Sequence, residues 1–246
     1  MYYYIYDDFV QNKKHEKELL KIENRLADLG VAGKVARLAL FKRADELILD
    51  EVKRGVKTVV LVGNDLTLCK VLDAVVESGV IFGIIPLGKS NNNVAKMLGV
   101  PEGVDACDVI SRRRVEKIDV GKCNDYRFIT GISFPKLKAE MVLNKSYILT
   151  PLPGGDVVVR NLAVGDVGSR EDVADPNDGQ LEVVVDVAGR WGKGGGQTKV
   201  PFKRMAFETK DPLTVSFDGN QIRNTKFKIF LDRKKLKVIV GKDRMF

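Results

Sequence analysis

Histidine and cysteine are scarce in this sequence of 246 residues. It has one histidine, His15, and three widely spaced cysteines, Cys69, Cys107 and Cys123. The cysteines form neither the even set of a disulfide framework nor a close metal-binding pair. A catalytic triad would depend on His15 alone, which lies in a charged run typical of a solvated helix. These absences exclude a His-ligated zinc centre and favour a reducing compartment, so we expect a cytoplasmic protein.

Long apolar runs are also missing. No stretch of about 18 apolar residues could span a bilayer. Residues 1–8 lack the basic and apolar regions of a signal peptide, so we expect none. The hydrophobic fraction of 44% and the charged fraction of 30% are those of a globular protein and exclude a disordered or fibrous one. The length allows one large domain or two small ones.

Positive charge is concentrated near the C-terminal end. The net charge is +8, and the last 56 residues carry 14 Lys and Arg against five Asp and Glu. Such an excess attracts phosphate groups, anionic lipids or nucleic acid, although a surface that only maintains solubility explains it as well. No nucleic-acid motif accompanies it, so we expect no nucleic-acid partner. We expect weak, salt-sensitive peripheral docking to anionic membranes.

The first half of the chain alternates strand and helix patterns. Residues 58–62 form a continuous β-branched run, which suits a strand buried on both faces of a parallel sheet. The alternation favours an α/β domain with a mostly parallel sheet. We predict strands at 2–6, 34–40, 58–62 and 81–85, and helices at 12–29, 44–54, 67–78, 91–98 and 104–113.

The second half changes character near residue 115. Short strand patterns follow one another between turn residues, and no long helical pattern interrupts them. This arrangement is typical of an antiparallel β-sandwich or barrel. We therefore predict two domains, residues 1–118 and residues 119–246. The strand patterns are at 127–132, 156–160, 181–187, 213–217, 226–231 and 236–240.

The predicted strand at 58–62 runs directly into a polar loop, Gly63-Asn64-Asp65-Leu66-Thr67, and then into a helix. Ligands of open α/β sheets bind at the carboxyl ends of the strands. A glycine there lets the backbone approach a phosphate, and a helix N-terminus supplies N–H donors. Asp65 could hold Mg²⁺ or orient a hydroxyl nucleophile, and Thr67 could cap the helix. A plain turn with a cap explains these residues equally well.

A second loop has the same construction. The predicted strand at 81–85 ends in Pro86-Leu87-Gly88-Lys89-Ser90-Asn91-Asn92-Asn93 before a helix. The loop offers a glycine, an ammonium group, a hydroxyl and amides as an anion cradle. Its glycine spacing differs from that of a Walker loop. A polar turn is the alternative, but two such loops on successive strands favour a shared phosphate site.

The two loops belong to an ordered set of motifs that spans roughly residues 55–240. Together the motifs resemble the diacylglycerol kinase/sphingosine kinase catalytic family, which shares its nucleotide-binding half with NAD kinases. The resemblance implies an N-terminal α/β nucleotide-binding domain with a mostly parallel sheet and a C-terminal antiparallel β-sandwich. The later motifs are Leu98-Gly99-Val100-Pro101, Ile118-Asp119-Val120-Gly121, the segment 175–183 around Asp178-Gly179, and the segment 215–220 around Asp218-Gly219.

The resemblance also implies an activity and a site. The activity is ATP-dependent phosphate transfer to a hydroxyl of a diacylglycerol-like or other lipid, with Mg²⁺. Asp65 would be the catalytic carboxylate, and Asp178 would contribute to the metal site. The nucleotide would be held by Gly63, Asn64, Thr67, Gly88, Lys89, Ser90 and Asn91.

The sequence departs from the family pattern at several of these positions. Asn64 and Leu66 replace two glycines, Asn92 replaces an acid, and Asn220 replaces the glutamate expected to act as general base. An amide cannot take up a proton at neutral pH. Two hypotheses follow: a divergent lipid kinase, or a degenerate member that binds nucleotide or lipid or acts as a scaffold. NAD phosphorylation is a third, and a homo-oligomer remains open.

Overall fold

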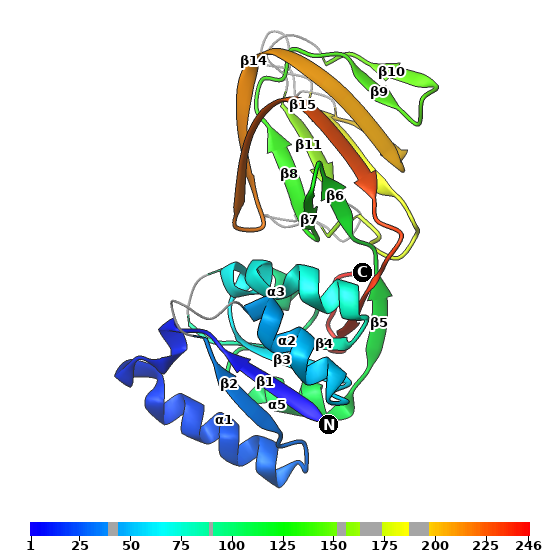
Figure 1. The fold of residues 1–246 in the computed structure, drawn as a ribbon. Coiled ribbons are helices and arrows are strands. Elements are labelled where there is room, and N and C mark those ends of the chain that lie inside the picture. Colours follow the sequence, from blue (N-terminus) through cyan, green and yellow to red (C-terminus); the bar gives the residue numbers. More distant parts are fainter. Residues whose placement is uncertain (39–43, 89–90, 152–155, 163–173, 187–196) are drawn as a thin grey trace, which may run out of the picture. The chain divides into compact units, whose positions relative to one another are not determined.

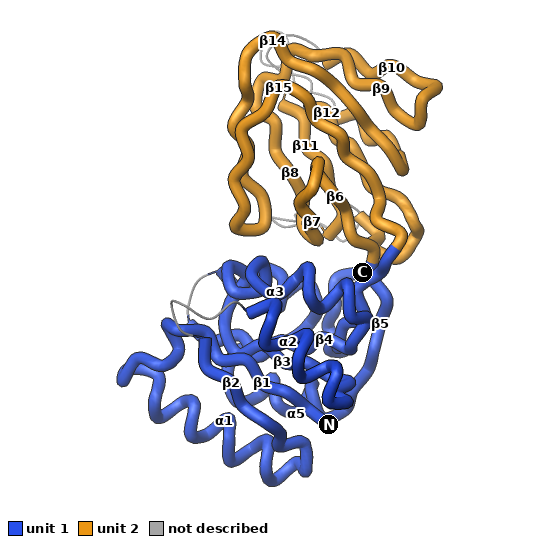
Figure 2. Tube along the Cα trace, viewed as in Figure 1, with its two compact units in different colours: residues 1–118, 234–246 blue, residues 119–233 orange. Residues whose placement is uncertain are grey.

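The structure is a computed structural model of the chain. It describes all residues except 39–43, 89–90, 152–155, 163–173 and 187–196. The chain divides into two compact units (Figure 2). Unit 1 comprises residues 1–118 and 234–246, and unit 2 comprises residues 119–233.

Unit 1 is built on a six-stranded sheet of order β2-β1-β3-β4-β16-β5. The first five strands in this order run parallel, and β5 is antiparallel to β16. This confirms the predicted α/β class with a mostly parallel sheet. The strands are β1 (Tyr2–Tyr6), β2 (Lys34–Arg37), β3 (Thr58–Gly63), β4 (Ile81–Pro86), β5 (Val115–Ile118) and β16 (Leu236–Ile239).

Helices cover both faces of this sheet (Figure 1). α1 and α5 pack together and are joined by the Arg25–Asp108 ion pair at 2.6 Å, while α2 contacts α3. β4 and α5 approach closely at Gly83, where a Cβ would lie 2.7 Å from Ile110 Cδ1. The helices are α1 (Glu16–Asp28), α2 (Ala44–Lys53), α3 (Asp65–Ser78), α4 (Asn93–Met97) and α5 (Asp105–Arg112), and two 3-10 turns, η1 (Phe9–Gln11) and η2 (Lys13–His15), precede α1.

The C-terminal residues 234–246 lie in unit 1, although the sequence pattern placed them with the second domain. The reason is strand pairing: β16 inserts between β4 and β5 and buries Leu236, Val238 and Ile239. Lys234 forms an ion pair with Glu77, at the end of α3. A strand pattern identifies a strand but not its partner, so the sequence alone could not assign this segment.

Unit 2 consists of two antiparallel sheets that share one hydrophobic core, as predicted for a β-sandwich. The six-stranded sheet has the order β10-β9-β14-β15-β6-β7, and the four-stranded sheet has the order β13-β12-β11-β8. The strands are β6 (Gly121–Cys123), β7 (Tyr126–Phe128), β8 (Gly131–Phe134), β9 (Met141–Leu143), β10 (Tyr147–Leu149), β11 (Val157–Arg160), β12 (Leu181–Asp186), β13 (Gln197–Phe202), β14 (Arg204–Phe217) and β15 (Asn220–Leu231).

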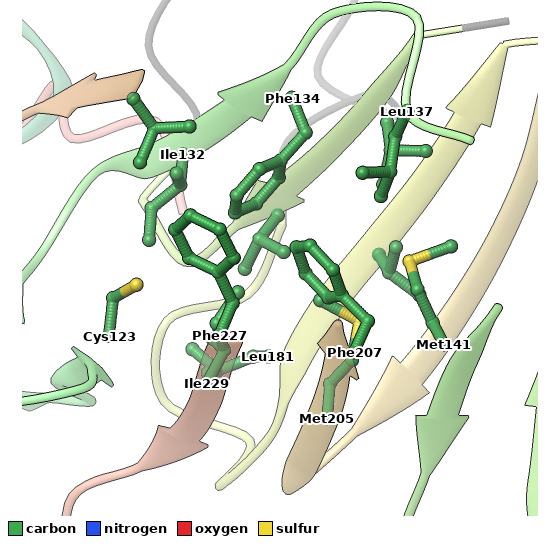
Figure 3. Packing of buried hydrophobic residues seen from close by; sticks show 14 of the residues in the cluster. Cys123, Ile132, Phe134, Leu137, Met141, Leu181, Met205, Phe207, Phe227 and Ile229 are labelled. Atoms are coloured by element: carbon green, nitrogen blue, oxygen red, sulfur yellow. The ribbon is translucent and has the colours of Figure 1, made fainter. Parts of the chain in front are cut away.

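Aromatic rings occupy the centre of this core (Figure 3). Phe207 and Phe227 stack with ring centroids 5.0 Å apart, and Phe134 meets both rings edge-on. Phe134 comes from the four-stranded sheet and the other two from the β14–β15 hairpin. The aromatic cluster therefore joins the two sheets of unit 2.

Candidate functional site

The two loops that the sequence singled out lie side by side in unit 1. They follow the neighbouring parallel strands β3 and β4, where Gly63 is in register with Pro86. The Asp65 N–H donates to the carbonyl oxygen of Asn91 at 2.7 Å. The carboxyl edge of the sheet thus brings the first loop into direct contact with the second.

Asn64 caps helix α3 and accepts the backbone N–H groups that a bound phosphate would need. Its Oδ1 accepts the N–H groups of Leu66 at 3.1 Å and of Thr67 at 3.4 Å. In return, Thr67 Oγ1 accepts the Asn64 N–H at 3.3 Å, which completes a capping box. The helix therefore begins at Asp65, two residues earlier than predicted, and Leu66 lies in its first turn without a positive φ.

The carboxylate of Asp65 caps the next helix. Oδ2 accepts the Asn93 N–H at 2.8 Å, and Oδ1 accepts the Val94 N–H at 3.2 Å. A negative charge at this helix N-terminus interacts favourably with the helix dipole. Asp65 thus supplies, from within the chain, the negative charge that the sequence analysis assigned to a bound phosphate.

Asp7 is a member of this cluster that the sequence analysis missed. It follows β1, is 4% exposed, and accepts a hydrogen bond from Thr67 Oγ1. Lys70 Nζ lies 3.5 Å from its Oδ2. Gly63 permits this packing, since a Cβ there would lie 2.7 Å from Thr67 Oγ1. The rule that ligands and polar groups gather at strand carboxyl ends would have pointed to Asp7.

The second loop turns through two positive φ angles, 94° at Gly88 and 60° at Asn91. Asn92, which replaces the family acid, donates from Nδ2 to the Gly88 carbonyl at 2.5 Å and to Glu102 Oε1 at 2.9 Å. Lys89 and Ser90 lie outside the described residues. In the described part of this loop, the polar groups serve the turn and the helix that follows.

The motif acids of unit 2 also serve turns. The buried Asp119 accepts the Gly179 N–H at 2.8 Å, which joins two of the motifs quoted above. Asp178 accepts the Gln180 N–H at 2.8 Å. Within the described ranges, no group of three or more His, Cys, Asp and Glu is placed to hold a metal ion. The metal role of Asp178 remains a prediction.

Asp218 and Gly219 form the turn between β14 and β15, and both have positive φ angles. The Asp218 carboxylate accepts the Ile129 N–H at 2.6 Å and the Thr130 N–H at 3.2 Å, and it also binds Thr130 Oγ1. Desolvation raises the pKa of Asp218, while these hydrogen bonds lower it. Asn220 follows as the first residue of β15 and is half-buried.

These contacts test whether a triphosphate fits at the two helix ends. The N–H groups of Asn64, Asp65, Leu66 and Thr67 all donate within the chain, and those of Asn93 and Val94 donate to Asp65. A phosphate needs such donors, and a carboxylate beside it repels it. In this arrangement the described residues at the two helix ends do not fit an ATP phosphate group.

Comparisons with known proteins identify the fold and the family. The family profile "Diacylglycerol kinase catalytic domain" matches residues 2–123. A crystal structure of a diacylglycerol kinase from Bacillus anthracis strain Sterne superposes with a TM-score of 0.81 at 18% identity, covering 98% of this chain and 97% of that one.

An uncharacterised protein of Synechocystis sp. is 28% identical over 138 residues, which are 55% of this chain. The match covers 30% of that relative's length. No helix in the described part of the chain is long and apolar enough to cross a membrane. The family profile matches residues 2–123, and the sequence departs from the family pattern at the positions noted above. The chain is therefore a divergent member of the diacylglycerol kinase catalytic family.

Proposed function

We propose that this chain is a binding protein with the lipid-kinase fold that does not transfer phosphate efficiently. One observation carries the proposal: Asn64 and Asp65 cap the two helices whose N-termini would have to hold the nucleotide phosphates. The ligand class that we propose is an anionic lipid surface.

The energy needed to free these helix N-termini argues against nucleotide binding. Losing a helix N-cap costs about 1 kcal/mol, and each hydrogen bond to a charged group contributes about 1.5–3 kcal/mol. Opening the Asn64 cap and both Asp65 bonds would therefore consume several kcal/mol. Millimolar binding corresponds to only about 4 kcal/mol, so reorganisation would cancel most of the affinity of a typical nucleotide.

The departures at Asn92 and Asn220 add to this loss. Loss of a general base typically lowers a rate about 10²–10⁴-fold. Phosphoryl transfer depends almost entirely on positioning and electrostatics, which these substitutions weaken. The expected turnover is therefore small even where a nucleotide is forced to bind.

The second candidate is ATP-dependent phosphate transfer to a lipid hydroxyl. The contact between the two loops and the retention of Asp65 between them favour it. It requires both caps to open, with Mg²⁺ brought in by the nucleotide. NAD as the acceptor is the same hypothesis with a different substrate and is tested in the same assay.

Phosphate transfer from Mg-ATP to diacylglycerol in mixed vesicles, and to NAD, tests the proposal. We expect the full chain to give no more product than the protein-free control. Turnover that Asp65→Asn abolishes would overturn the proposal and establish the second candidate. Asp125→Asn is the matched control, because Asp125 is an exposed turn residue far from this loop in the sequence.

A further inference from the structure

The outer face of the six-stranded sheet in unit 2 combines apolar side chains with cations. Strand register aligns Ile148, Val142, Ala206 and Lys228 in one row across β10, β9, β14 and β15. Their neighbours along these strands, such as Leu143, Met205 and Ile229, are buried in the core. Because side chains alternate along a strand, this row points away from the core.

A second row lies beside the first on the same face. It contains Arg204, Phe230 and Lys122 on β14, β15 and β6. Between the two rows lies a groove of about 420 Å³. Its apolar lining includes Val142, Ala206 and Phe230, and its cations are Lys145, Arg204 and Lys228.

The charge of the groove is of one sign. None of its lining residues is acidic, and Lys145, Arg204 and Lys228 form no ion pair with any described residue. Glu208, two residues along β14 from Ala206, pairs with Lys226 at 3.4 Å. The apolar lining is therefore surrounded by cations available to an external anion.

The hairpin of β9 and β10 beside the groove is held in a defined conformation. Asn144 and Lys145 have φ angles of 51° and 64°, and the Ser146 N–H donates to the Leu143 carbonyl, as in a type I′ turn. Asn144 Oδ1 accepts the N–H groups of Lys203 and Arg204, which ties the turn to β14. Lys145 is thereby fixed at the tip of the hairpin.

The edge strand β10 exposes two large apolar side chains. Tyr147 and Ile148 are each 68% exposed, and Val142 beside Ile148 is 42% exposed. An exposed apolar edge favours association with another surface. Register pairs Tyr147 with the buried Leu143, so alternation places Tyr147 on the opposite face from Ile148, and the apolar side chains of the outer face are Ile148 and Val142.

We propose that this face, with the hairpin tip Lys145, docks on an anionic lipid bilayer. The cations would meet lipid phosphates and carboxylates, while Ile148 and Val142 enter the headgroup boundary. A second copy of the chain is a poor occupant, because a symmetric contact would bring the cations of both copies together. The inference rests on the proposed function and deepens it by naming the surface.

Vesicle co-sedimentation of the full chain tests the inference. We expect binding to phosphatidylcholine vesicles that contain phosphatidylserine, weaker binding at high salt, and little binding to phosphatidylcholine alone. Each cation near an anionic bilayer changes affinity about fivefold, so the triple variant Lys145→Gln/Arg204→Gln/Lys228→Gln should bind about 100-fold more weakly.

A matched variant separates this face from total charge. Lys17→Gln/Lys21→Gln/Lys57→Gln removes the same charge from exposed sites in unit 1 and should bind within about threefold of the wild type. Ile148→Ser should weaken binding without changing the circular dichroism spectrum. Equal losses in both triple variants, binding to neutral vesicles, or no vesicle binding at all would overturn the inference. So would a dimer in solution that Ile148→Ser dissociates.

The two assays can fail separately. The vesicle assay reports on the sheet face of unit 2 and needs no nucleotide. The transfer assay reports on the loops of unit 1. If the chain bound vesicles and also showed turnover that depends on Asp65, the docking inference would hold. The proposal of a binding protein would then be wrong, and the chain would be an enzyme.

Discussion

The two units use their polar residues in different ways. In unit 1 the Asn64 and Asp65 side chains accept backbone N–H groups of the helices that follow, and Thr67 binds Asp7. In unit 2 the buried Asp119 and the half-buried Asp218 hold turns, while the cations of the six-stranded sheet remain on the surface. Among the described residues, the motif side chains of both units therefore hold helix ends and turns.

The largest expected effect is the loss of a buried aromatic ring from the core of unit 2. Phe227 is fully buried and stacked on Phe207, so Phe227→Ala should destabilise the chain by about 3–5 kcal/mol. Tyr147→Ala, at an exposed site in the same unit, should change stability by less than about 0.5 kcal/mol. Denaturant unfolding measures both. Similar losses would show that the ring cluster does not hold the two sheets together.

The next effect concerns the glycine retained in the first loop. Gly63→Ala would place a Cβ 2.7 Å from Thr67 Oγ1 and should destabilise the chain by about 1–3 kcal/mol without any nucleotide. In a Thr67→Ala background the cost of Gly63→Ala should fall. If Gly63→Ala cost the same stability in both backgrounds, packing against Thr67 would not be the reason for a glycine at this position.

A smaller effect measures the cap itself. Asn64→Ala should cost about 1 kcal/mol of stability, whereas Asn64→Asp, which can still cap the helix, should cost little. Urea unfolding of the three proteins provides the comparison. If alanine were neutral, the N–H groups of α3 would not depend on Asn64, and the argument against a phosphate there would lose its main support.

The smallest effect is the pH dependence, which has opposite signs in the two units. Hydrogen bonds from Lys34 and Arg54 lower the pKa of Glu51 in unit 1, whereas desolvation raises the pKa of Asp218 in unit 2. The stability that Glu51 contributes to the folded state is present above its unfolded pKa of about 4.3. It is lost as the pH falls through the lowered pKa. The stability that Asp218 contributes is present below its unfolded pKa of about 3.9. It is lost as the pH rises through the raised pKa.

Two variants check these signs. Glu51→Gln should flatten the loss of stability on acidification, and Asp218→Asn should steepen it. Unfolding free energies between about pH 3 and 7 provide the measurement. A steeper acid dependence in Glu51→Gln would contradict the assigned direction.

The sequence predicts the elements better than their partners. The β-branched run of β3 and the alternating pattern of the first half identified the parallel sheet, because burial on both faces leaves a clear composition. The position of β16 in unit 1 could not be predicted, since pairing depends on the register and neighbours of distant segments.

The site shows the same limit at the level of side chains. Sequence position placed Gly63, Asp65 and Asn91 near one another, and the hydrogen bond between Asp65 and Asn91 brings two of these residues together. It did not reveal that Asn64 and Asp65 turn their acceptors toward the helix N–H groups. That choice depends on the first turn of α3 starting at Asp65 and on the buried Asp7 behind it.

The central claim is that the side chains of Asn64 and Asp65 occupy the helix N–H groups that a nucleotide phosphate would need. Calorimetric titration of Mg-ATP into the full chain tests it most directly, with Asn64→Gly/Leu66→Gly as the variant that opens the first loop. We predict no binding tighter than about 1 mM for the wild type, corresponding to about 4 kcal/mol, and tighter binding for the variant. Submillimolar binding by the wild type that Asp65→Asn changes would contradict the claim.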